Sequence, residues 1–253
     1  GTGYLFRTLL EGGYLQGEAR TVWGDSLSGY TREPCLDDSG LQWRESPHQS
    51  LDSSVLTDVA SPFSKEGGLR LLTGNLGRSI IKTSAVPESN YLIEAPAVVI
   101  EHQDDLEALF SAGNLNQDCV VVVRGQGPKA NGMPELHKLT PFLGSLQDQG
   151  YRVALVTDGR MSGASGKVPA AIHLTPEATD GGLIGRVESG DLVRLDAVAG
   201  VLELLVPEEA LANRRSWIAD QAQSPSCGRG LFQLNRSQLS QAEQGASFLF
   251  GEA

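Results

Sequence analysis

Two apolar, strand-like runs, each followed at once by a glycine-rich loop, constrain the fold of this chain more than any other feature. The runs cover residues 118–123 and 151–156, and the loops cover 125–135 and 157–167. Glycine lets a ligand approach the backbone closely, and successive N–H groups in such loops attract anions. Because ligands of open α/β folds gather at the carboxyl ends of strands, the two loops together predict a polar site for an anion. The alternative for residues 157–167, taken alone, is an ordinary surface turn.

The order of the elements predicts an α/β fold, with a β-barrel-like domain of many short strands flanked by helices. Short apolar runs between turn residues give candidate strands at 69–73, 78–84, 96–101, 118–124, 151–157, 170–174, 183–187, 192–196 and 201–206. Helical spacing of apolar residues gives candidate helices at 103–111, 134–149, 207–220 and 235–244.

The amino-terminal quarter of the chain has a different pattern. Residues 3–12 have helical spacing and end at a Gly-Gly pair, whereas residues 18–65 are rich in Ser, Asp, Pro and Gly and show little periodicity. Because a structureless loop of this length is unusual within one domain, we expect a boundary near residue 65. The predicted domains are therefore 1–66 and 67–253.

Composition argues against several classes of function. The net charge of −11 argues against a nucleic-acid partner, which requires a basic face. No apolar run approaches the ~20 residues that cross a bilayer, so no membrane partner is expected. Cys35, Cys119 and Cys227 lie far apart, which fits neither a disulfide framework nor a zinc site. Cys119 lies in an apolar run and is expected to be a small buried hydrophobic residue.

Several long sequence motifs occur in the same order as in a known protein family. They are TGNLG at 73–77, IEAPA at 93–97, GPKANGMPE at 127–135 and TDGRMSGASGK at 157–167. With these motifs the chain resembles the dihydroxy-acid/6-phosphogluconate dehydratase family over nearly its whole length. The continuation VPAAIH at 168–173 and PEA at 176–178 is more similar to the 6-phosphogluconate branch than to the branched-chain amino-acid branch.

The resemblance implies a barrel domain related to the swivelling domains of aconitase-like enzymes. Family members carry a further amino-terminal half, whose cysteines hold an iron–sulfur cluster. We therefore expect a cluster, of the 4Fe–4S type, with its ligands outside this chain, and residues 1–66 as a remnant of that catalytic domain. The resemblance also implies a divalent ion such as Mg²⁺, a homodimer, and a cytoplasmic enzyme.

The resemblance assigns roles to residues of the two glycine-rich loops. Ser162 matches the position of the proton acceptor, with hydrogen bonding to substrate as its alternative role. Glu135 matches a carboxylate that reaches the divalent ion, with helix capping as its alternative. The predicted substrate-binding residues are Lys129, Arg160, Ser165 and Lys167.

Two further residues are expected to be structural. Asp158 is expected to shape its own turn through a bond from side chain to backbone, which is a common role of Asp in loops. His173, after an apolar run, is expected to be structural rather than catalytic.

The family chemistry is the removal of water from a 2,3-dihydroxy acid to give a 2-keto-3-deoxy acid. The branch implies that the substrate is 6-phosphogluconate, a small anionic sugar acid, in the Entner–Doudoroff route. The alternatives are a dehydratase of another sugar acid or of branched-chain dihydroxy acids, and, outside the enzymes, a non-catalytic anion-binding domain.

Overall fold

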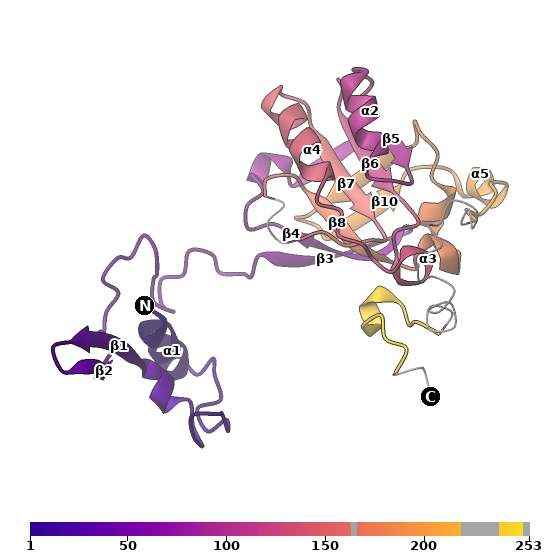
Figure 1. The fold of residues 1–253 in the computed structure, drawn as a ribbon. Helices are drawn as coiled ribbons and strands as arrows, with labels where there is room; N and C mark the ends of the chain where they lie inside the picture. The colour runs from indigo at the N-terminus through magenta and orange to yellow at the C-terminus, as the bar shows by residue number, and fades with distance from the viewer. Residues whose placement is uncertain (163–165, 219–237, 250–253) are drawn as a thin grey trace. The chain divides into compact units, whose positions relative to one another are not determined.

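The computed structural model describes residues 1–162, 166–218 and 238–249. The chain forms two compact units, Gly1–Gly67 and Gly68–Ala253. Figure 1 traces the larger unit as a barrel with helices against its outer surface. The candidate site belongs to this larger unit.

Eight strands in the described part of the larger unit close into a barrel, in the order β10-β3-β4-β8-β7-β6-β5-β9. This confirms the predicted barrel with flanking helices. Strands β5 to β8 run parallel to one another, so their carboxyl ends meet at the same edge of the barrel. The strands are β3 (Leu69–Gly74), β4 (Gly77–Lys82), β5 (Leu92–Ile100), β6 (Cys119–Val123), β7 (Val153–Thr157), β8 (Ala170–Thr175), β9 (Leu192–Asp196) and β10 (Val201–Leu204).

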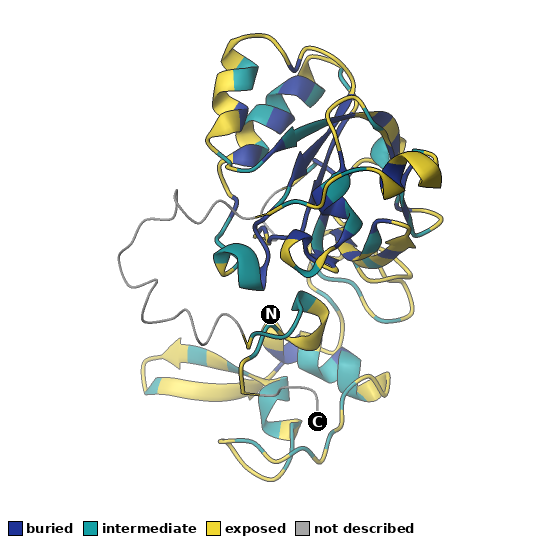
Figure 2. Cartoon of the chain, turned by 90° about the vertical axis from the view of Figure 1, so that its right-hand side faces the viewer, coloured by how far each residue is buried: buried dark blue, intermediate teal, exposed yellow. Residues whose placement is uncertain are grey.

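The core has two layers, one inside the barrel and one between the barrel and its helices. On β6, Val120 and Val122 pack inside the barrel, while Cys119 and Val121 pack against the helices α2 (Asp105–Ser111) and α4 (Leu139–Asp148). Every residue of β6 and β7 is fully buried, as expected for parallel strands that are covered on both faces. Figure 2 shows these buried strands beneath helices with exposed outer faces. The prediction that Cys119 is a buried hydrophobic residue is confirmed.

The motif TGNLG at residues 73–77 forms the tight connection between β3 and β4. Gly77 has a φ of +127°, and a Cβ at this position would lie 2.2 Å from the carbonyl oxygen of Thr175. The side chain of Asn75 bonds the backbone of Leu204 twice, accepting its N–H at 2.8 Å and donating to its carbonyl at 2.9 Å. These contacts join the connection to β8 and β10. Because a Cβ would collide with the Thr175 carbonyl, only glycine fits at position 77 without backbone movement.

The short helical elements of the larger unit lie between the strands. They are the α-helices α2 (Asp105–Ser111), α3 (Pro128–Asn131), α4 (Leu139–Asp148) and α5 (Glu208–Ala212), and the 3₁₀ helices η2 (Glu88–Asn90), η4 (Ala178–Asp180), η5 (Leu183–Arg186) and η7 (Ala242–Gln244). Phe110 of α2 and Phe142 of α4 pack together, with ring centroids 5.3 Å apart.

Four of the predicted elements need correction. The predicted strand 183–187 is the 3₁₀ helix η5, although its Ile184 is fully buried like a strand residue. The predicted helix 134–149 begins only at Leu139, because Glu135 pairs in extended form with Arg160.

The other two corrections lie near the carboxyl end. Within the described residues, the predicted helix 207–220 is limited to Glu208–Ala212, after which Arg214 turns back to pair with Asp191; residues 219 and 220 lie outside the described part of the chain. The predicted helix 235–244 lies partly outside the described residues, and its described end is the 3₁₀ helix η7.

The smaller unit contains the predicted first helix, α1 (Thr2–Glu11), and more order than its composition indicated. The 3₁₀ helix η1 (Ser28–Thr31) leads into a hairpin of β1 (Arg32–Asp37) and β2 (Gly40–Glu45). The prediction that residues 18–65 are irregular is therefore wrong for the hairpin. Most of its residues are exposed, so the hairpin has no strongly buried face of the kind that makes a strand easy to predict.

Candidate functional site

The two glycine-rich loops of the sequence lie at the edge of the barrel where the parallel strands end. One loop follows β6, the other follows β7, and a third segment, which begins at Pro176, follows β8. Backbone N–H groups and ionisable side chains from all three segments meet here. This arrangement is the one that the strand-and-loop pattern predicts.

Asp158, the first residue after β7 in chain order, holds the three segments together. Its carboxylate is fully buried and accepts backbone N–H groups of Gly125 at 3.1 Å, Gln126 at 2.9 Å and Ala178 at 3.0 Å. Burial raises the pKa of this carboxyl group, and the three N–H donors oppose that rise. Asp158 therefore does more than the expected shaping of its own turn, because these bonds go to two other loops. Its own turn is bonded by the Thr157 hydroxyl, which accepts the N–H of Gly159 at 2.9 Å.

A second buried carboxylate, Glu177, lies on the segment after β8. It accepts the N–H groups of Lys129 and Ala130, each at 3.0 Å, and so binds the start of α3. Burial is again the main cause that raises the pKa of Glu177, and the charges of Asp158 and Asp180 add to the rise. Glu177 was not among the predicted site residues, because its contacts depend on how distant loops meet.

Lys129, a predicted substrate ligand, is engaged in an ion pair. Its ammonium lies 2.7 Å and 2.9 Å from the two carboxylate oxygens of Asp180, and both side chains are largely buried. The carboxylate of Asp180 also accepts a hydrogen bond from Gln241 at 2.7 Å. A substrate anion would therefore compete with Asp180 for this ammonium.

The structure brings Glu135, Arg160 and Ser162 together. One Glu135 oxygen lies 2.8 Å from the Arg160 guanidinium, and the other accepts the backbone N–H of Ser162. Arg160 also donates to the carbonyl of Met133 at 2.8 Å, which fixes the two loops side by side. Because α4 begins four residues later, the alternative that Glu135 caps this helix is wrong.

The remaining predicted ligands are not part of this cluster. The ammonium of Lys167 binds the carboxylate of Asp148 near the end of α4. Ser165 lies outside the described residues. Ser162 itself is exposed.

His173 is a further ionisable residue beside the cluster. It is half-buried on β8, has a φ of +56°, and donates its backbone N–H to the carbonyl of Gly159 at 2.9 Å. Burial, and then the charge of Arg160, lower the pKa of its imidazole, so it is neutral at near-neutral pH. The sequence assigned it a structural role, and its closeness to Arg160 depends on the meeting of β8 with the loop after β7.

Within the described residues, no group of three or more His, Cys, Asp or Glu side chains is close enough to hold a metal ion. The described cysteines do not fit as ligands of an iron–sulfur cluster. Cys119 is enclosed in the sheet, where burial raises the pKa of its thiol to about 11, and Cys35 lies in the smaller unit. Glu135 can offer one carboxylate to a divalent ion. Among the helices of the described chain, none combines the length and apolar character needed to span a membrane.

Comparison with known proteins gives consistent matches. The family described as dihydroxy-acid/6-phosphogluconate dehydratase, C-terminal, matches residues 54–246. The phosphogluconate dehydratase of Escherichia coli K12 is 56% identical over 98% of the chain, and that of Pseudomonas aeruginosa is 54% identical over 97%. A dihydroxy-acid dehydratase of Wolinella succinogenes is 35% identical over 81% of the chain.

The chain spans 41% of the length of the Escherichia coli relative and 40% of that of the Pseudomonas relative. The matched family region covers the whole described barrel, with both glycine-rich loops. The chain therefore belongs to the dihydroxy-acid/6-phosphogluconate dehydratase family and represents its carboxy-terminal region.

Proposed function

We propose that this chain is the carboxy-terminal part of a hydro-lyase that dehydrates 6-phospho-D-gluconate to 2-dehydro-3-deoxy-6-phospho-D-gluconate in the Entner–Doudoroff pathway. The observation that carries the proposal is the identity of 54–56% to two phosphogluconate dehydratases over at least 97% of the chain. The relative named dihydroxy-acid dehydratase is 35% identical, which favours the phosphorylated sugar acid over the alternative substrates.

The reaction needs a base for the proton on C2 and a route for the hydroxyl that leaves C3. We assign the base to Ser162, which is exposed on the loop after β7. The contact of its backbone N–H with Glu135 supports this role, because it fixes the position of the residue. When C2 loses its proton and C3 its hydroxyl, the resulting enol rearranges to the 2-keto product.

Charge at the site limits what Arg160 alone can do for Ser162. A serine hydroxyl is a poor base unless nearby positive charge favours its ionised form. The Arg160 charge is paired with Glu135 at 2.8 Å, so the pair is close to neutral overall. The site therefore requires additional positive charge before Ser162 can act.

A divalent ion such as Mg²⁺, or an iron–sulfur cluster, would supply the additional positive charge when bound. It would also act as a Lewis acid toward the leaving hydroxyl. Glu135 fits as one carboxylate ligand of a divalent ion, since Mg²⁺ is commonly held by one or two carboxylates with water and substrate. We propose that the ligands of the cluster lie in the part of the enzyme that precedes this region.

Substrate binding is proposed for Lys129, Arg160, Ser165 and Lys167. Arg160 is the most accessible of the described members, with about half of its side chain exposed (49%). We also propose that the full-length enzyme is cytoplasmic and a homodimer.

The test is an assay of the full-length protein, purified without oxygen, with three substrates in parallel. 6-Phosphogluconate, another sugar acid and a branched-chain dihydroxy acid are each followed for 2-keto product. We expect the highest kcat/KM with 6-phosphogluconate. Higher kcat/KM with either other acid would select that alternative, and no turnover with any acid would favour an anion-binding domain.

A further inference from the structure

A pocket lined by arginines lies outside the cluster of Glu135 and Ser162. Its volume is about 680 Å³, and it lies between the ends of β5 and β6, the segment that follows η5, and the residues after α5. Its charged and aromatic lining residues are Arg124, Arg186, Glu188, Arg214, Arg215 and Trp217. Four cationic side chains against one lining carboxylate are unusual in a chain with a net charge of −11.

Two of the four lining arginines, Arg124 and Arg214, are paired with carboxylates. Arg214 binds the carboxylate of Asp191 at 2.8 Å and donates to the carbonyl of Arg186 at 3.0 Å. Arg124 binds Glu101 at 3.0 Å. Both positive charges are therefore matched by carboxylates within the fold.

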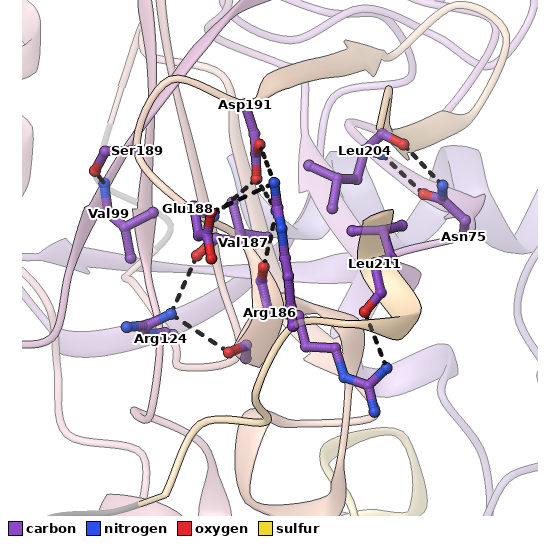
Figure 3. A network of polar contacts seen from close by, with 12 residues as sticks. Asn75, Val99, Arg124, Arg186, Val187, Glu188, Ser189, Asp191, Leu204 and Leu211 are labelled. Atoms are coloured by element: carbon purple, nitrogen blue, oxygen red, sulfur yellow. Dashed lines mark hydrogen bonds and ion pairs between the residues drawn. The ribbon is translucent and has the colours of Figure 1, made fainter. Parts of the chain in front are cut away.

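Among the described residues, the other two arginines have no such match. Within that part of the chain Arg186 donates only to uncharged oxygens, the Leu211 carbonyl at 3.4 Å and the Ser216 hydroxyl at 3.3 Å, and its buried Nε has no partner there. Figure 3 shows Arg186 and Arg124 within this network. Arg215 is exposed, and no acidic group among the described residues pairs with it. A partly buried guanidinium without a counter-ion favours the binding of an anion.

The pocket and the candidate site share one edge of the barrel. Arg124 directly follows β6, and the next two residues, Gly125 and Gln126, donate their N–H groups to Asp158 at the end of β7. Neighbouring strands lie about 4.8 Å apart. The arginine pocket therefore begins one strand away from the strand that leads into the Ser162 loop.

We propose that this pocket binds the phosphate group of a phosphorylated sugar acid, with Arg186 and Arg215 as its specificity-determining residues. The proposal rests on the function proposed above. Dehydration takes place at C2 and C3, next to the carboxylate, so the phosphate lies at the opposite end of the substrate. A phosphate dianion matches two uncompensated guanidinium groups, and arginine binds phosphate through parallel hydrogen bonds.

The test compares 6-phosphogluconate with gluconate in the full-length enzyme. For Arg215→Ala we expect the ratio of kcat/KM values, phosphorylated over unphosphorylated, to fall about 10- to 100-fold, the scale of charge-assisted hydrogen bonds. The loss should be mostly in KM, and Arg215→Lys should restore part of it. The matched control is Arg194→Ala, which removes an exposed arginine of β9 that pairs with Glu94 and Glu203 and does not line the pocket.

A second measurement separates this proposal from the proposed function. Inorganic phosphate is titrated into the wild-type, Arg215→Ala and Arg194→Ala proteins by calorimetry, which requires no turnover. Binding that is lost only in Arg215→Ala supports the pocket, even if no acid is dehydrated. Absent binding in the wild type, equal binding in all three proteins, or an unchanged substrate preference in Arg215→Ala would each overturn the proposal.

Discussion

Replacing Asp158 by Asn tests whether one buried carboxylate holds the loops of the candidate site. The change keeps the shape of the side chain and exchanges one acceptor oxygen for an NH₂ group. In the wild type one oxygen accepts the N–H groups of Gly125 and Ala178, and the other accepts that of Gln126. In the best orientation, the amide oxygen keeps the first two donors, and its NH₂ group faces the N–H of Gln126.

The magnitude follows from this count of donors. One buried donor left without an acceptor costs about 1–3 kcal/mol. We expect Asp158→Asn to lower the local free energy of opening by this amount, since three loops share the one side chain. Asp158→Ala leaves three donors without an acceptor and should cost about 3 kcal/mol or more.

The assay is native-state hydrogen exchange, which reports local opening free energies. Protection should fall at the amides of Gly125, Gln126 and Ala178 and change little in the first helix. The matched control is Asp196→Ala, because Asp196 also accepts two backbone N–H groups, each at 2.8 Å, in a half-buried turn. Water can replace this side chain, so its loss should cost about 1 kcal/mol or less. Equal protection in wild type and Asp158→Ala would refute the role of Asp158.

The stability cost of Asp158→Asn should depend on pH. Burial raises the pKa of Asp158 above its ordinary value of 3.8, so the folded protein binds this proton more tightly than the unfolded chain. The resulting stabilisation is fully present below pH 3.8 and is lost as pH rises through the folded pKa. Because Asn does not titrate, the cost of Asp158→Asn should be larger near pH 4 than near pH 8. A cost that increases with pH would contradict the raised pKa.

Three further predictions concern the chemistry. In the full-length enzyme, Ser162→Ala should lower kcat at least ~100-fold with a much smaller effect on KM; a variant that keeps a tenth of the wild-type rate with intact cofactors would exclude Ser162 as the base. Glu135→Gln should weaken the binding of the divalent ion, because an amide is a poorer ligand than a carboxylate, and activity should recover partly at high metal concentration. Unchanged metal affinity in a titration would limit Glu135 to its contacts with Arg160 and Ser162. Residues 67–253 alone should fold but give no 2-keto product, because the cluster ligands are expected elsewhere, and clear turnover would refute this division of the active site.

The barrel could be predicted from the sequence where local pattern and burial agree. The predicted strands 118–124 and 151–157 contain uninterrupted apolar runs at 119–123 and 153–156, which is the pattern of parallel strands buried on both faces. Residues 183–187 show the limit of this inference. Ile184 packs in the core, but a short apolar stretch beside glycines forms a 3₁₀ turn as readily as a strand.

The candidate site was predictable in its loops but not in its contacts. The resemblance places Glu135 and Ser162 in two loops, and the parallel order of β6 and β7 brings them together. Asp158 could not be interpreted from its neighbours in sequence, because its hydrogen-bond donors lie 33, 32 and 20 residues away. Contacts over such separations depend on strand order, which local patterns do not determine.

The structure also changes which cations are available to an anionic substrate. The sequence identifies Lys129, Arg160 and Lys167 by their position in glycine-rich loops, but each is paired with a carboxylate, that of Asp180, Glu135 or Asp148. A substrate anion must displace or share that carboxylate, so each cation contributes less than its formal charge indicates. Arg186 and Arg215, which lie outside both loops, pair with no carboxylate among the described residues. On the function proposed here, recognition of the charged substrate would depend on unpaired charge at this edge of the barrel, a property that counting residues in a motif does not reveal.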